Sequence, residues 1–104
     1  MRVLLLGGTA EGRALAAQLH PDVDVISSLA GRVPDPALPV GEVRIGGFGG
    51  VDGLATWLSE HGVDAVVDAT HPFAATITAH TATACRRLGM PSVILARPAW
   101  PHGR

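Results

Sequence analysis

The sequence contains no lysine and no tyrosine, so all 8 of its basic residues are arginine. The missing lysine excludes a Walker A phosphate loop, which needs that side chain, and it excludes Schiff-base chemistry on a lysine amine. The chain also cannot carry the tyrosine–lysine pair of a short-chain dehydrogenase. Any catalysis must therefore rely on His, Asp, Glu, Arg, Ser, Thr or the one Cys, or on a bound cofactor or partner.

Cysteine and charged residues are also scarce. A single cysteine cannot form an internal disulfide, which favours an intracellular, cytoplasmic setting. Charged residues make up 16% of the chain, against about 25% in typical soluble domains. We therefore expect part of the surface to be covered by another domain, a second copy of the chain or a large ligand. The net charge of −1 argues against non-specific binding to nucleic acid, which requires a basic face.

Long apolar runs are missing from the N-terminus as well. The run at residues 3–6 is too short for a secretion signal and far too short to span a membrane, so no membrane association is predicted. The length of 104 residues suits one domain with a buried core.

Short apolar runs alternate with amphipathic segments, which is typical of α/β proteins. Strands are predicted over residues 3–6, 23–27, 43–45, 65–68 and 92–95. Helices are predicted over residues 11–19, 53–61 and 72–88, with Asp52 as the N-cap of the second and Pro72 in the first turn of the third. The pattern predicts a Rossmann-like, doubly wound sheet of five parallel strands, most simply in the order 3-2-1-4-5. Residues 1–96 are assigned to this domain, and residues 97–104 to the start of a linker.

The turn after the first predicted strand is rich in glycine, and ligands of doubly wound sheets bind at the carboxyl ends of the strands. Gly7 and Gly8 would let backbone N–H groups approach a phosphate at the N-terminus of the following helix. The turn is not a clean G-x-G-x-x-G motif, and a tight turn without a ligand is the alternative. Its position favours phosphate binding, with Glu11 complementing the helix dipole.

The segment after the second strand indicates which dinucleotide is bound. An NAD site usually places Asp or Glu here to hold the ribose 2′-hydroxyl, and no acid occurs between Ser27 and Pro34. Ser27, Ser28 and Arg32 supply two hydroxyls and a guanidinium, which suit the 2′-phosphate of NADP. NADP is therefore favoured over NAD; the alternative is that Arg32 is an ordinary exposed loop residue.

Two further segments follow the third and fourth strands. Gly46 to Gly50 surround Phe48, either because the backbone approaches a flat or bulky ligand or because Phe48 folds into the core of a flexible connector. Thr70 and His71 stand where the next helix begins. His71 could cap that helix, contact a substrate or move a proton.

Other residues that could carry chemistry are given structural roles. The histidines show no metal-ligand spacing, so no metal is predicted. Cys85 and Trp57 are expected in the core. Four threonines of the third helix are expected to face solvent and bond their own helix; they are Thr76, Thr78, Thr81 and Thr83.

Four segments together resemble a known family. They are residues 7–13, 28–32, 43–50 and 68–74, which read GGTAEGR, SLAGR, VRIGGFGG and DATHPFA. In this order and with this spacing they closely resemble the precorrin-6A reductases of cobalamin biosynthesis. Residues 97–100 resemble the segment that follows the fifth strand of that family, so the resemblance covers essentially the whole chain.

The resemblance implies an NADPH-dependent reductase that transfers a hydride to a double bond of the precorrin-6A macrocycle and gives precorrin-6B; a sister activity uses the cobalt-bearing substrate. It also implies two Rossmann-like domains with the cofactor and the macrocycle between them. This chain would supply only the N-terminal domain, and we expect it to be weakly active or inactive without the other. The alternatives are a non-catalytic NADP(H)-binding module and a flavodoxin-like interaction domain; self-association stays open.

The same resemblance, with the residues above, gives each candidate a role. The predicted cofactor-binding residues are Gly7, Gly8, Thr9, Ser28, Ala30, Gly31, Arg32, Gly47, Phe48, Gly49, Thr70 and Pro72. Those of the first turn would hold the pyrophosphate and those around residues 28–32 the 2′-phosphate, while residues 47–49 and 70–72 would frame the nicotinamide and the macrocycle edge. The predicted substrate-binding residues are Glu11, His71 and Phe73, and His71 is the candidate proton donor.

Overall fold

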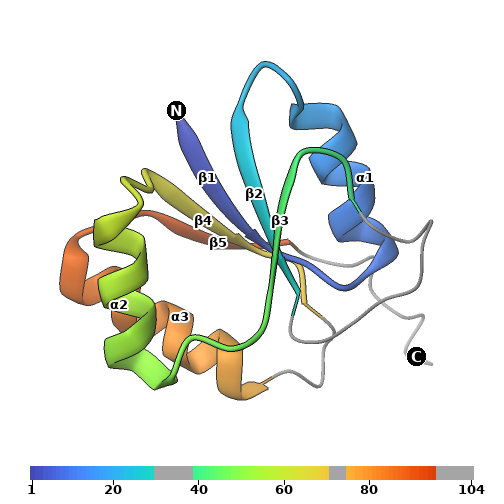
Figure 1. The fold of residues 1–104 in the computed structure, drawn as a ribbon. Helices are drawn as coiled ribbons and strands as arrows, with labels where there is room; N and C mark the ends of the chain where they lie inside the picture. Colours follow the sequence, from blue (N-terminus) through green and yellow to red (C-terminus); the bar gives the residue numbers. More distant parts are fainter. Residues whose placement is uncertain (30–38, 71–74, 96–104) are drawn as a thin grey trace.

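The computed structural model describes residues 1–29, 39–70 and 75–95 (Figure 1). In this part of the chain, five parallel strands form one sheet in the order β3-β2-β1-β4-β5. The strands are β1 (Arg2–Leu6), β2 (Asp24–Leu29), β3 (Glu42–Ile45), β4 (Ala65–Asp68) and β5 (Ser92–Ile94). The helices are α1 (Ala10–Leu19), α2 (Gly50–Glu60) and α3 (Ala75–Leu88). The predicted fold class and strand order are confirmed.

β1 lies in the middle of the sheet, and its side chains are apolar on both faces. Leu4 and Leu6 pack with residues of α2 and α3 in one core, whereas Leu5 packs with α1 on the opposite face. Figure 1 shows α1 on one side of the sheet and α2 and α3 on the other. Cys85 is buried in the first core and Trp57 packs against it, as predicted. The doubly wound arrangement brings the carboxyl ends of all strands to one edge.

The predicted N-cap of α2 is wrong. α2 begins at Gly50 and follows Gly49, which has a φ of 82° and makes no side-chain cap hydrogen bond. Glycine adopts this left-handed conformation without a steric cost, so the chain can turn into the helix without a polar cap. Asp52 lies within the first turn, and its carboxylate pairs with the Arg87 guanidinium of α3 at 2.7 Å.

Two strand ends also differ from the prediction. β2 continues through Ser28 and Leu29 because these residues pair with Arg44 and Ile45 of β3. Ser28 therefore lies in the sheet rather than in a loop. β5 ends one residue early and forms an exposed edge.

The third helix agrees with its predicted end. α3 ends at Leu88, and Gly89 follows it with a φ of 66°. Its predicted start at Pro72 lies outside the described residues, as does the predicted linker at residues 97–104. No helix in the described part of the chain is both long and apolar enough to cross a membrane.

Candidate functional site

Glycine lets the first βα turn and the start of α1 lie close together. A Cβ on Gly12 would lie 3.3 Å from the Gly7 Cα, which is tighter than an ordinary van der Waals contact, so a larger residue here would have to push α1 and the turn slightly apart. Gly8 has a φ of 102° and is exposed, and the Gly7 amide donates to the Ser28 carbonyl at 2.9 Å. Close approach of helix and turn is the role of the last glycine in a dinucleotide-binding turn.

Thr9 connects this turn to the end of β4. Its hydroxyl donates a hydrogen bond to the Ala69 carbonyl at 2.6 Å and accepts one from the Gly12 amide at 3.0 Å, which caps α1. The hydroxyl proton is therefore already used inside the protein. If Thr9 binds a phosphate, as the sequence predicted, it must do so through its backbone N–H.

Ser28 lies at the carboxyl end of β2 beside Arg44 of β3. The residue is 5% exposed, and its hydroxyl accepts a hydrogen bond from Arg44 Nη1 at 3.0 Å. Sequence reasoning missed Arg44 because it treated β3 only as a strand. The signal was present, since the predicted strand order sets β3 beside β2 and so brings an arginine to the predicted 2′-phosphate site.

Arg44 also holds the loop that follows its own strand. Its guanidinium donates to the carbonyls of Gly46 and Gly47 at 2.9 and 3.1 Å, and it lies 3.9 Å from the centre of the Phe48 ring. Partial burial lowers the pKa of Arg44. No carboxylate within the described ranges forms an ion pair with it.

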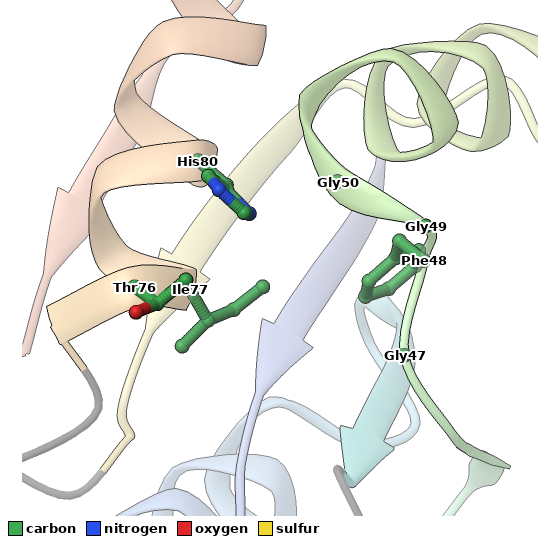
Figure 2. Close-up of a pocket in the computed structure, with 7 residues that line it drawn as sticks. All are labelled: Gly47, Phe48, Gly49, Gly50, Thr76, Ile77 and His80. Atoms are coloured by element: carbon green, nitrogen blue, oxygen red, sulfur yellow. The ribbon is translucent and has the colours of Figure 1, made fainter.

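A pocket of about 380 Å³ opens between the loop before α2 and the first turns of α3 (Figure 2). Figure 2 shows the Phe48 ring on one side and Ile77 and His80 on the other. The remaining lining residues are Gly47, Gly49, Gly50 and Thr76. A Cβ on any of these three glycines would meet nothing within 4 Å, so backbone borders open space here. Sequence reasoning identified the loop but missed His80, which lies one helical turn beyond Thr76.

Asp68 organises the end of β4 as a buried acceptor. The residue is 3% exposed, and its Oδ1 accepts from the Thr70 amide at 3.0 Å and from the Thr70 hydroxyl at 2.6 Å. Its Oδ2 accepts from the Thr78 hydroxyl at 2.6 Å. Thr78 therefore does not bond its own helix as predicted, whereas Thr81 does, donating to the Ile77 carbonyl at 2.7 Å. Thr81 is buried, however, so the expectation that it faces solvent is wrong.

This network fixes what Thr70 can offer a ligand. Because the Thr70 hydroxyl donates its proton to Asp68, its oxygen can only accept a hydrogen bond from elsewhere. A ligand group at Thr70 would therefore have to be a donor, such as an amide N–H.

The structure brings several of the predicted site residues to one edge of the sheet. Those that it describes there are Gly7, Gly8, Thr9, Ser28, Gly47, Phe48, Gly49 and Thr70, while Glu11 lies in the first turn of α1. The predicted residues Ala30, Gly31, Arg32, His71, Pro72 and Phe73 lie outside the described residues. Among the residues that the structure describes, no group of three His, Cys, Asp or Glu side chains could hold a metal ion.

Comparison with known proteins identifies the family. A family model described as precorrin-6x reductase CbiJ/CobK matches residues 2–104. The chain belongs to the precorrin-6x reductase CbiJ/CobK family. This confirms the resemblance found in the four sequence segments.

Individual members of the precorrin-6x reductase family are similar to this chain in sequence and structure. A precorrin-6A reductase from Mycobacterium tuberculosis (strain CDC 1551 / Oshkosh) is 72% identical over 102 residues, covering 98% of this chain and 42% of the relative. One from Rhodococcus erythropolis is 64% identical over 101 residues, covering 95% and 41%. A solved structure of CobK precorrin-6A reductase superposes with a TM-score of 0.89 at 42% identity, covering 96% and 40%. The chain thus spans about two fifths of the length of these relatives.

Proposed function

We propose that this chain is the cofactor-binding part of an NADPH-dependent precorrin-6A reductase of cobalamin biosynthesis. The observation that carries the proposal is the 72% identity to a curated precorrin-6A reductase over 98% of this chain. In the proposed reaction, a hydride and a proton add across one double bond of the macrocycle. The chain alone would supply one wall of the active site, and the rest of the protein would supply the other.

The first βα turn fits a dinucleotide pyrophosphate. Gly8 leaves an exposed backbone without a side chain, and the N-terminus of α1 begins directly behind it. Backbone N–H groups and the helix dipole at such an end favour a phosphate. The backbone N–H groups of Gly8 and Thr9 would hold the pyrophosphate, without any need for the lysine that this sequence lacks. Gly7 would border it without a side chain, since its own amide is bonded to the Ser28 carbonyl.

The adenosine end of the cofactor would lie toward β2 and β3. Ser28, Ala30, Gly31 and Arg32 would surround the 2′-phosphate, since arginine and hydroxyl groups suit a dianionic ligand. Because the Gly47 carbonyl is bonded to the same arginine as Ser28, the pocket beside Gly47, Phe48 and Gly49 suits the adenine better than the nicotinamide. The sequence-based expectation put residues 47–49 beside the nicotinamide, and we propose the adenine there instead.

The nicotinamide would lie toward β4, near residues 70–72. When bound, NADPH supplies the hydride of the reaction. The Thr70 hydroxyl, held by Asp68 as an acceptor, could receive a hydrogen bond from the carboxamide N–H. His71 is the proposed proton donor, and Glu11 and Phe73 are the proposed macrocycle contacts.

A reductase assay tests the proposal. A hybrid protein would carry this chain in place of the matching part of the Mycobacterium tuberculosis relative, and the unaltered relative would serve as the positive control. With precorrin-6A and NADPH we expect NADPH absorbance to fall in step with product. If the control is active, the hybrid is folded and NADPH absorbance stays constant, the reductase proposal is wrong. Saturable NADPH binding without reduction would point to a non-catalytic NADP(H)-binding module.

A further inference from the structure

We propose that Arg44 binds the 2′-phosphate of the cofactor and so determines the preference for NADPH over NADH. This inference rests on the proposed function and adds a specificity residue to it. Sequence reasoning assigned the 2′-phosphate to Ser28 and Arg32, whereas the structure places the guanidinium of Arg44 beside Ser28.

The position of Arg44 supports this role. Ser28 and Arg44 are register partners at the carboxyl ends of β2 and β3, and Arg44 Nη1 reaches the Ser28 hydroxyl at 3.0 Å. In dinucleotide-binding folds, the end of β2 is where the ribose 2′ position is read. A ligand group that contacts Ser28 would therefore meet Arg44 as well.

The charge of Arg44 has no described counterion. Arg2 pairs with Asp24 and Arg87 pairs with Asp52, but no carboxylate in residues 1–29, 39–70 or 75–95 pairs with Arg44. Its hydrogen-bond acceptors there are a hydroxyl and two carbonyls, which are neutral. A partly desolvated cation gains more from an anion than from neutral acceptors, so this end of the sheet favours a phosphate.

Arg44 also has N–H donors that its described hydrogen bonds do not use. A guanidinium carries five N–H groups, and the three hydrogen bonds of Arg44 use Nη1 twice and Nη2 once. Nε–H and one Nη2–H have no partner among the residues that the structure describes. Two N–H groups on one planar guanidinium can bind two phosphate oxygens at once.

The guanidinium is already oriented before any ligand arrives. The Gly46 and Gly47 carbonyls hold it from one side, and the Phe48 ring lies 3.9 Å from it. Fixing the side chain in advance removes the entropy cost of ordering it on binding. Phe48 also lines the pocket of Figure 2, so the proposed phosphate site and the proposed adenine pocket adjoin through one ring.

Binding of NADPH and NADH by this chain, measured by calorimetry, tests the role of Arg44. We expect Arg44→Gln to raise the Kd for NADPH about tenfold or more, which is typical of one lost charged hydrogen bond, and to leave the Kd for NADH nearly unchanged. Arg86→Gln is the matched control, because it removes the same charge from the exposed last turn of α3. This control should leave both constants unchanged.

Two results would overturn the role of Arg44. If Arg44→Gln loses equal affinity for NADPH and NADH, Arg44 only stabilises the loop that follows β3. If it loses affinity for neither, Arg44 has no role in binding. Thermal melts would verify that each variant folds. If Arg44→Gln does not fold, Arg44→Lys can replace it. This variant keeps the charge but loses the planar donor pair, so it should still weaken the binding of NADPH selectively.

The unaltered chain separates the two proposals. If it binds neither nucleotide, the proposed function itself fails. If it prefers NADPH and both Arg44 variants keep that preference, only the role of Arg44 fails.

Discussion

The Thr9 hydroxyl and the Ala69 carbonyl form a 2.6 Å hydrogen bond between the first βα turn and the end of β4. These residues are far apart in sequence, and the bond is buried. It joins the proposed pyrophosphate turn to the segment proposed to border the nicotinamide. This hydrogen bond adds to the pairing of β1 with β4, which already sets the separation of the two parts of the candidate site.

Replacing Thr9 by alanine should destabilise the chain. The change removes the cap of α1 and leaves the buried Ala69 carbonyl without its donor, which together should cost about 2 kcal/mol. Urea unfolding measures this loss. Thr9→Ser keeps the hydroxyl and should recover most of the stability, while a Thr9→Ala variant as stable as the original would show that the bond contributes little.

Filling the pocket of Figure 2 should weaken both nucleotides alike. Thr76 is exposed and lines the pocket, so Thr76→Trp should occupy it without disturbing the core. We expect the Kd values for NADPH and NADH to rise together by about tenfold or more, because they share the adenine. Thr56→Trp, on the exposed side of α2, is the control. Unchanged binding in Thr76→Trp would exclude the adenine from this pocket.

Arg32→Ala should lower the preference for NADPH, because it removes one of the two arginines proposed to contact the 2′-phosphate. Combining it with Arg44→Gln should leave NADPH and NADH with similar Kd values. The ratio of the two Kd values, measured for the single and double variants, checks this. If the double variant still prefers NADPH strongly, another group must bind the 2′-phosphate.

The chain should lose stability at alkaline pH because of Cys85. Burial raises the pKa of its thiol, and a hydrogen bond with Ser92 opposes this only in part. The contribution to stability is therefore complete below the thiol's ordinary pKa and is lost as the pH rises through the raised one. The sequence has no lysine or tyrosine, so neither of these two side-chain types titrates in the alkaline range.

Urea unfolding at a series of pH values measures that decline. In Cys85→Ala the decline should largely disappear, although the variant should be less stable overall because of the cavity it creates. The folded chain should also react slowly with a thiol-alkylating reagent and quickly in urea. An equally steep alkaline decline in Cys85→Ala would contradict the assignment.

The fold could be predicted from the sequence because local patterns determine most of it. Residues 3–6 are apolar on both faces, which places β1 at the centre of the sheet with helices on either side. The start of α2 could not be predicted from its polar residues. Gly49 stands at the N-cap position that Asp52 was expected to occupy, and Asp52 instead forms an ion pair with Arg87 of α3.

The sequence indicated which segments form the candidate site, but not all the residues that meet there. The glycine turn and Ser28 were found because their roles depend on their position after a strand. Arg44 and His80 were missed because their roles depend on neighbours from other elements: Arg44 meets Ser28 across two strands, and His80 faces Phe48 across the pocket. The predicted strand order could have indicated the first pairing, but the second follows from the packing of α3 against the loop before α2, which periodicity in the sequence does not reveal.

A nuclear magnetic resonance titration of isotope-labelled chain with NADPH tests the central proposal most directly, because it locates the ligand residue by residue. We predict saturable shifts in the amide signals of Gly8, Ser28, Gly47 and Thr70, with that of Ser28 much smaller when NADH replaces NADPH. Shifts confined to the opposite edge of the sheet, or none at all, would contradict it.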